Sequence, residues 1–165
     1  MVQDSIEQLV RLIEHEIGLY ESFLDCTLQQ RQALISNDET GIQTLTAEQD
    51  RLLRQISATE KSSLAVMSRC AENAELADPV SITALAERLD EPDSRELLGA
   101  AHRLLETGTA VRSENMINRH LIGNLIEVTD FCLRSVASFS PTAEAYRSDG
   151  SVSQQPLSLT LDSKV

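Results

Sequence analysis

Hydrophobic residues recur at intervals of three and four positions along most of the chain. The longest run in one register comprises Leu97, Ala101, Leu104, Gly108, Val111, Asn115, Asn118, Ile122, Leu125, Thr129, Cys132, Val136 and Phe139. This spacing places the side chains on one face of a long helix that packs lengthwise against other helices. A helix of about 43 residues measures roughly 65 Å at about 1.5 Å per residue, so we expect an elongated molecule.

A first helix is predicted from about Asp4 or Ser5, which offer N-cap oxygens, to Ile35. Its expected buried face contains Ile6, Leu9, Ile13, Ile17, Tyr20, Leu24, Leu28 and Ile35.

A second helix is predicted to end near Asn73 and carries Ile42, Leu45, Leu52, Ile56, Val66 and Cys70 in the same rhythm. The Ser36-Asn37-Asp38 segment separates the two helices, and its short polar side chains tolerate left-handed backbone. Asp38 or Thr40 is positioned to cap the second helix. A turn this short favours an antiparallel hairpin.

The remaining segments complete the predicted fold. A short amphipathic helix near 82–90 lies between two proline-containing breaks. The last 25 residues are rich in Ser, Gln, Thr and Pro and lack helical periodicity, which is typical of disorder. We therefore predict an all-α fold, an elongated antiparallel bundle of three long helices with a short crossover helix and a disordered C-terminal tail. The predicted helical domain covers 1–140 and the tail 141–165.

Within that tail, Leu157, Leu159 and Leu161 alternate with polar residues. The alternation admits two interpretations, a solvated tail or a strand-like segment that docks on a partner.

Two amides, Asn115 and Asn118, interrupt the apolar register of the last helix. A buried amide costs stability unless it is paired, so amides at such positions either set the register of the bundle or meet a partner. Both interpretations stay open for this pair.

Composition narrows the function classes. The formal net charge of −12 disfavours nucleic acid and anionic membrane surfaces as partners, because both require clustered Lys and Arg. No signal peptide or apolar spanning segment is present, which predicts a cytoplasmic protein without membrane insertion. Three widely spaced cysteines indicate neither a disulfide framework nor a zinc site. Cys70 and Cys132 are expected in the core, and Cys26 is expected to be exposed.

No catalytic or cofactor-binding pattern is found. The Glu-x-x-His pairs of a di-iron bundle are absent, as are the phosphate-binding and nucleophile motifs that depend on clustered glycines. His15 lies between two glutamates without ligand spacing. We expect a protein that is not an enzyme and that needs no metal or cofactor.

Two stretches resemble a known family. They are ALISNDETGIQTLTAEQDRLLRQISATE, which ends at Glu60, and SENMINRHLIGNLIEV, followed by Tyr146 and Gly150. Together they resemble the FlgN family of flagellar export chaperones. In that family a first helix closes on an Asn-Asp turn, and a long last helix carries paired asparagines before an aliphatic run. This chain departs from the pattern in its longer tail and at Glu60-Lys61, where an arginine is expected soon after the glutamate.

The resemblance implies a cytoplasmic chaperone that binds the C-terminal segments of hook-associated junction proteins of the FlgK and FlgL type. It also implies delivery to the type III export gate, with Tyr146 as the gate contact. We expect a monomer or weak dimer. The other candidate functions are a structural coiled-coil adaptor and a helical regulator that senses a small ligand.

The client-binding residues are expected near the end of the last helix. That helix is longer than the predicted hairpin, and its final turns carry more apolar residues than one packing seam requires. The candidate residues are Leu121, Ile122, Leu125, Val128, Phe131, Val136 and Phe139.

Overall fold

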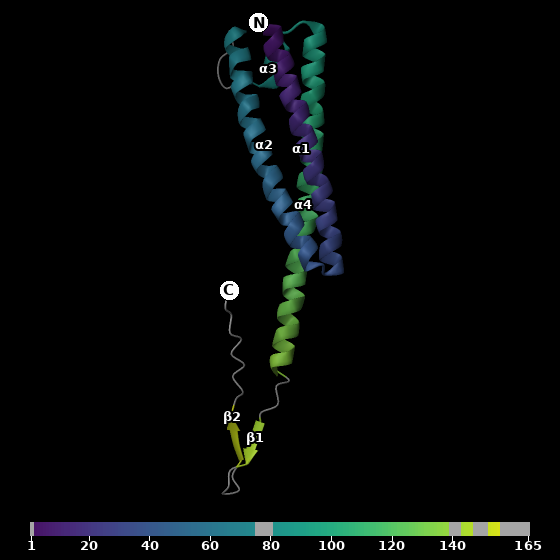
Figure 1. Ribbon diagram of the computed structural model, residues 1–165, viewed down its shortest axis with the longest axis vertical. Helices are drawn as coiled ribbons and strands as arrows, with labels where there is room; N and C mark the ends of the chain where they lie inside the picture. The colour runs from purple at the N-terminus through teal and green to yellow at the C-terminus, as the bar shows by residue number, and fades with distance from the viewer. Residues whose placement is uncertain (1, 75–80, 139–142, 147–151, 156–165) are drawn as a thin grey trace. The chain divides into compact units, whose positions relative to one another are not determined.

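The computed structural model describes residues 2–74, 81–138, 143–146 and 152–155 (Figure 1). Its elements are α1 (Val2–Ser36), α2 (Glu39–Asn73), α3 (Ile82–Ala86), α4 (Glu91–Ser138), β1 (Ala143–Tyr146) and β2 (Val152–Gln155). The chain forms two compact units, Met1–Ile122 and Gly123–Val165. The predicted fold class, an all-α bundle with three long helices and a short crossover helix, is confirmed. The boundary predicted at residue 140 stays a prediction.

Local chemistry explains the turn between α1 and α2. Asn37 adopts a left-handed conformation with φ of 55°, which asparagine tolerates better than most residues. Asp38 caps α2, since its carboxylate accepts a hydrogen bond from the backbone N–H of Gly41 at 3.0 Å. A Cβ atom at Gly41 would lie 2.4 Å from Asp38 Oδ2, so a larger residue there would displace the capping carboxylate. The predicted turn and the predicted cap at Asp38 are both confirmed.

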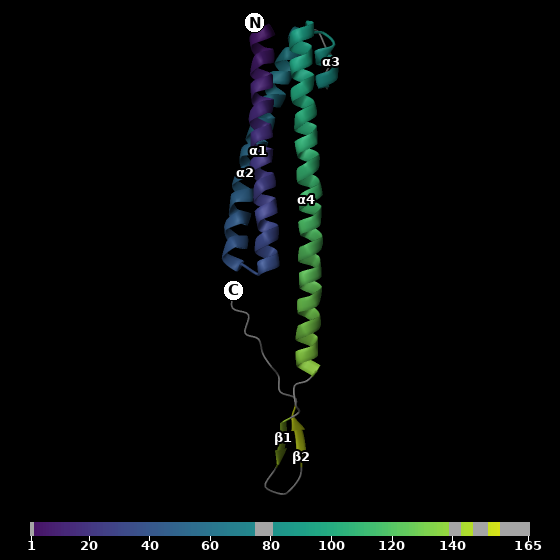
Figure 2. The same cartoon turned by 90° about the vertical axis from the view of Figure 1, so that its right-hand side faces the viewer.

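Within the first unit, α2 runs antiparallel to α1, and the first part of α4 runs parallel to α1 (Figures 1 and 2). One apolar cluster joins the N-terminal half of α1 to the end of α2, α3 and the start of α4. Its buried members are Ile6, Leu9, Val10, Ile13, Ile17, Val66, Cys70, Leu85, Ala86, Leu97 and Ala100. A second cluster lies further along α1 and consists of Leu19, Phe23, Leu52, Ile56 and Val111. These two clusters contain most of the buried apolar side chains of the described residues.

The buried face of α1 differs from the prediction in its second half. Leu28 is 41% exposed and Ile35 is 64% exposed, whereas Phe23 and Thr27 are buried. The reason is that α1 contacts two long helices on different sides, and its contacts with α4 include polar side chains. A hydrophobic pattern cannot register a polar contact, so the predicted stripe follows only part of the true interface.

Two cysteines also depart from their predictions. Cys70 is fully buried as expected, but Cys26 is half-buried and packs against the second cluster instead of facing solvent. Cys132 was expected in the core and is exposed. Cys132 keeps the register of the last helix, but in this part of α4 no described helix covers that face.

The element boundaries agree closely with the predicted ones. α1 begins at Val2, so Asp4 and Ser5 lie inside its first turn and are not its N-cap. α2 ends at Asn73, as predicted. The crossover helix is shorter than the predicted 82–90, and the Ser81 hydroxyl accepts a hydrogen bond from the backbone N–H of Ala84 at 3.1 Å.

The second unit contains the end of α4 and a pair of strands. β1 and β2 are antiparallel, with Tyr146 opposite Val152. The segment predicted to be disordered therefore includes two short strands, because backbone pairing needs no apolar periodicity. Phe139 and the residues from Leu157 to Leu161 lie outside the described residues.

Candidate functional site

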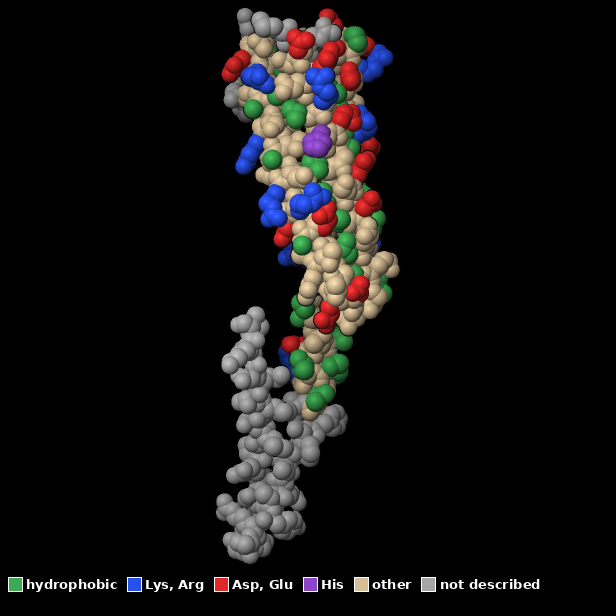
Figure 3. Space-filling view, in the orientation of Figure 1, with side chains coloured by type: hydrophobic (Ala, Val, Ile, Leu, Met, Phe, Trp, Pro, Cys, Tyr) green, Lys and Arg blue, Asp and Glu red, His purple; other side chains and the backbone are tan. Residues whose placement is uncertain are grey.

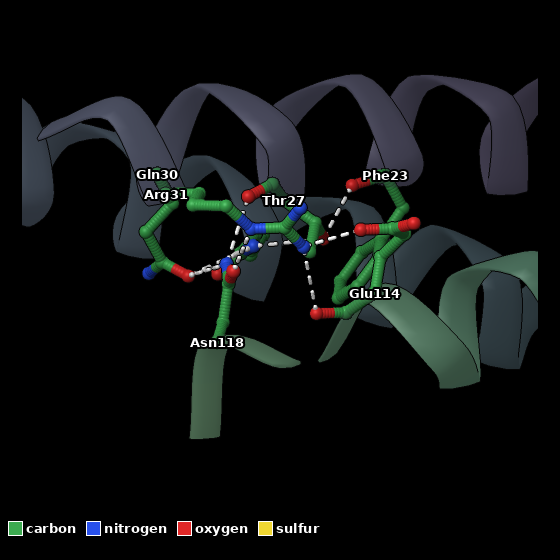
Figure 4. A network of polar contacts seen from close by, with 7 residues as sticks. Phe23, Thr27, Gln30, Arg31, Glu114 and Asn118 are labelled. Carbon is green, nitrogen blue, oxygen red and sulfur yellow. Dashed lines mark hydrogen bonds and ion pairs between the residues drawn. The ribbon is translucent and has the colours of Figure 1, made fainter. Parts of the chain in front are cut away.

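Asn118 lies in a buried polar layer between the long helices and is 3% exposed (Figure 4). Its side-chain N–H donates to the backbone carbonyl of Thr27 at 2.8 Å. Its carbonyl Oδ1 accepts a hydrogen bond from Arg31 Nε at 2.9 Å. The guanidinium of Arg31 also forms an ion pair with Glu114. Both polar ends of the Asn118 amide are thus paired with α1.

The same polar layer reaches α2. The Gln49 side-chain N–H donates to the hydroxyl of Thr27 at 3.2 Å, and that hydroxyl donates to the carbonyl of Phe23 at 2.8 Å. Gln30 donates to the Thr46 hydroxyl at 3.1 Å. Three helices therefore share one network. A slip of one helical turn, about 5.4 Å, would leave its buried members unpaired, so the network favours a single register.

Asn115 has a different environment from Asn118. It is exposed, and it lies at the lining of an open cleft in the first unit. One interpretation was that the amides set the register of the bundle, and the other was that they meet a partner. Each interpretation suits a different member of the pair. Asn118 is paired within the bundle, whereas Asn115 is accessible to a partner.

The cleft is lined by α1, α2, α3 and α4 and has a volume of about 610 Å³. A smaller cavity of about 180 Å³ shares four lining residues with it, Glu16, Glu60, Ile82 and Leu104. Glu16 is 4% exposed. Burial raises the pKa of Glu16, and the nearby charge of Glu60 raises it further. The cleft thus combines apolar walls with a buried carboxyl group.

The second unit carries a different surface on α4. Six large apolar side chains between 125 and 136 are at least 43% exposed: Leu125, Ile126, Val128, Phe131, Leu133 and Val136. Figure 3 shows hydrophobic side chains gathered on this stretch of α4. Monomeric proteins rarely leave so many large apolar residues contiguous and uncovered, so the surface is a candidate contact site.

Most of the predicted client-binding residues lie on this exposed face. Ile122 is 40% exposed, Leu121 is half-buried, and Phe139 lies outside the described residues. Tyr146, the predicted gate contact, is in β1, apart in sequence from the helical residues.

Sequence reasoning did not identify the buried carboxyl group or the polar partners of Asn118. Glu16 shares a helical face with Ile13 and Tyr20, which was the available signal, since an acidic residue on an apolar face is unusual. For Arg31 and Gln49 no comparable signal exists, because surface helices commonly carry both residue types.

The described residues were also searched for a metal site and for a membrane-spanning helix. Among them, no three His, Cys, Asp or Glu side chains are grouped so that they could hold a metal ion. None of the helices described is both long and apolar enough for a membrane span.

Comparison with known proteins identifies the family. No curated protein and no solved structure matches the chain. The family model described as FlgN protein matches residues 1–154, which is most of the sequence. The chain therefore belongs to the FlgN family, and its general role is that of a flagellar export chaperone.

Proposed function

We propose that the chain is a cytoplasmic chaperone that binds the C-terminal segments of FlgK-type and FlgL-type junction proteins and delivers them to the type III export gate. The observation that carries this proposal is the exposed apolar face of α4 between Ile122 and Val136. Such a face suits an amphipathic client helix, which would bury its own apolar side against it.

The distribution of charge on this part of α4 supports the proposal. At 100° per residue, Glu127, Asp130 and Arg134 fall on one narrow strip, and Asp130 pairs with Arg134 at 2.9 Å. The apolar residues occupy more than half of the circumference. Burying this apolar surface stabilises a complex by about 25 cal/mol per Å². Ordering the client costs entropy, which offsets part of this gain, so binding can remain reversible.

The two alternative functions receive less support. A ligand-sensing regulator would need a polar pocket around both amides, but Asn118 is bonded to α1 and Asn115 is exposed. A structural adaptor would join copies of the chain into a stable large oligomer. We propose a monomer or weak dimer, because the net charge of −12 opposes self-association.

The first test is co-elution of the full chain with a FlgK-type junction protein that has, or lacks, its C-terminal segment. We expect binding only when the segment is present. Leu125→Asp and Val136→Asp should abolish it, because each places a charge in the apolar face. His120→Asp is the matched control, since it adds the same charge at an exposed position on the opposite side of α4. The site is wrong if both variants stay folded and bind with wild-type affinity.

Delivery to the gate is tested separately from capture. Deleting residues 151–165 should weaken client binding less than either Asp substitution does. Tyr146→Ala should leave the affinity for the client unchanged and reduce the amount of junction protein secreted by flagellated cells. Loss of client binding in the Tyr146→Ala variant would contradict a separate gate-contact role.

A further inference from the structure

The cleft in the first unit has no part in the client contact proposed on the end of α4. Tyr20 and Glu16 from α1 line it, together with Glu60 from α2, Ile82 from α3 and a wall from α4. The lining residues of α4 are Ala101, Leu104, Leu105, Gly108, Thr109, Val111, Arg112 and Asn115. Of these, Leu105 is 70% exposed.

Two polar groups at the cleft lack partners among the described residues. Glu16 is 4% exposed, and its carboxyl group makes no hydrogen bond or ion pair there. The Ser63 hydroxyl lines the adjoining cavity, is buried, and has no hydrogen-bond partner. Of the two, the Ser63 hydroxyl is cut off from solvent, whereas the Glu16 carboxyl group lies at the open cleft, where another molecule can reach it. Buried polar groups are nearly always paired, so a carboxyl group without a protein partner on a buried side chain indicates a site that another molecule completes.

The charges around Glu16 favour a cation as that partner. Burial raises the pKa of Glu16, and the charge of Glu60, which lines the same cleft, raises it further. Burial, Glu60 and Glu16 together raise the pKa of Tyr20. Arg112 is the one basic residue that lines the cleft, and within the described residues it forms no ion pair. Two carboxyl groups against one guanidinium leave room for a further positive charge.

The size and lining of the cleft indicate which kind of molecule brings the positive charge. A volume of about 610 Å³ exceeds that of a single side chain, and the lining includes leucine, isoleucine and valine as well as the acids. Helices border the cleft on several sides, as they would border one more helix of a bundle. A second copy of this chain is a poor occupant, because its net charge of −12 repels the acidic cleft.

We propose that this cleft is a second docking site for the client, formed for an amphipathic helix that places a Lys or Arg side chain between Glu16 and Glu60. The inference rests on the proposed chaperone function, and it adds a specificity element. The face on α4 selects apolar helices, whereas the cleft selects those with a basic residue on the apolar side.

The test compares two double variants with equal net charge. Glu16→Gln with Glu60→Gln removes the acids from the cleft, and Glu21→Gln with Glu72→Gln removes exposed acids from the same two helices. The probe is the C-terminal segment of a FlgK-type junction protein, as the native peptide and with its Lys and Arg residues replaced by Gln. Affinity is measured by calorimetry on full-length protein, and thermal melting verifies folding.

We expect the cleft variant to bind the native peptide at least tenfold more weakly than wild type, and the control variant to bind within twofold of wild type. For the peptide without basic residues, all three proteins should bind alike. If wild type binds the native peptide but the two double variants have equal affinity, the cleft inference is overturned and the chaperone proposal stands. If wild type binds no junction segment, the proposed function fails, and the inference fails with it. If the wild-type protein forms a dimer and the cleft variant does not, the occupant of the cleft is a second copy of the chain and the client inference is overturned.

Discussion

At the scale of single residues, Asn115 and Asn118 show how position decides what one side chain does. They lie three residues apart on α4, and both belong to the same predicted register. Asn118 is paired at both ends of its amide with α1, and Asn115 is exposed. We therefore expect the same side chain to contribute more to stability at position 118 than at position 115.

Asn118→Ala should lower the free energy of unfolding by about 1–3 kcal/mol, because it removes the hydrogen bonds of Asn118 to Thr27, Gln30 and Arg31 and leaves buried partners unpaired. Asn115→Ala should change it by less than about 0.5 kcal/mol, as is usual at an exposed position. Urea denaturation of the two variants measures both values. Equal losses of unfolding free energy in the two variants would mean that the Asn118 hydrogen bonds do not stabilise the bundle.

The raised pKa of Glu16 predicts that the stability of the folded protein depends on pH. Its pKa in the folded protein is raised above the ordinary value of 4.5 by burial and by Glu60, so the folded state binds a proton more tightly than the unfolded state does. The charged form therefore costs stability at neutral pH, and this cost disappears as the pH falls through the raised pKa. Glu16→Gln should raise the melting temperature at pH 7 and give no gain below about pH 4.

Glu21→Gln serves as the control for that measurement, because Glu21 is exposed on the same helix. A gain from Glu16→Gln that is as large at pH 4 as at pH 7 would contradict the assignment of the effect to ionisation.

At the scale of elements, the phase of α2 can be tested directly. Leu52 is 2% exposed and packs with Phe23 and Ile56 in the second cluster. Leu52→Ala should cost about 2–4 kcal/mol of unfolding free energy, since it leaves a cavity in the core. Gln55→Ala, at an exposed position one turn away, should cost under about 0.5 kcal/mol. Similar losses of unfolding free energy at the two positions would show that the face of α2 that contains Leu52 is not the face that packs against α1.

α4 illustrates what periodicity does and does not report. Its spacing of three and four residues runs from Leu97 to Val136, but Leu97 is fully buried whereas Val136 is 67% exposed. A stripe records which face of a helix is apolar, not whether another helix covers that face. The exposed end of α4 became a candidate contact site only when burial was known.

At the scale of the whole molecule, the sequence by itself determined the fold class and most element boundaries. The spacing of apolar residues predicted three long helices, and the Asn37-Asp38 turn required the first two to be antiparallel. These features depend on local chemistry: backbone tolerance at Asn37, the capping carboxylate of Asp38, and the closeness of Gly41 to it. Local interactions are readable from neighbouring residues, so the sequence alone suffices for them.

Only the tertiary structure decided which side chains meet across helices. It placed Thr27 and Arg31 against Asn118, buried Glu16 in a cleft, and left Cys132 exposed. These outcomes depend on the positions at which α2 and α4 pack around α1. Contacts between residues more than 80 positions apart are set by that packing, and a polar residue gives no periodic signal of its buried partner.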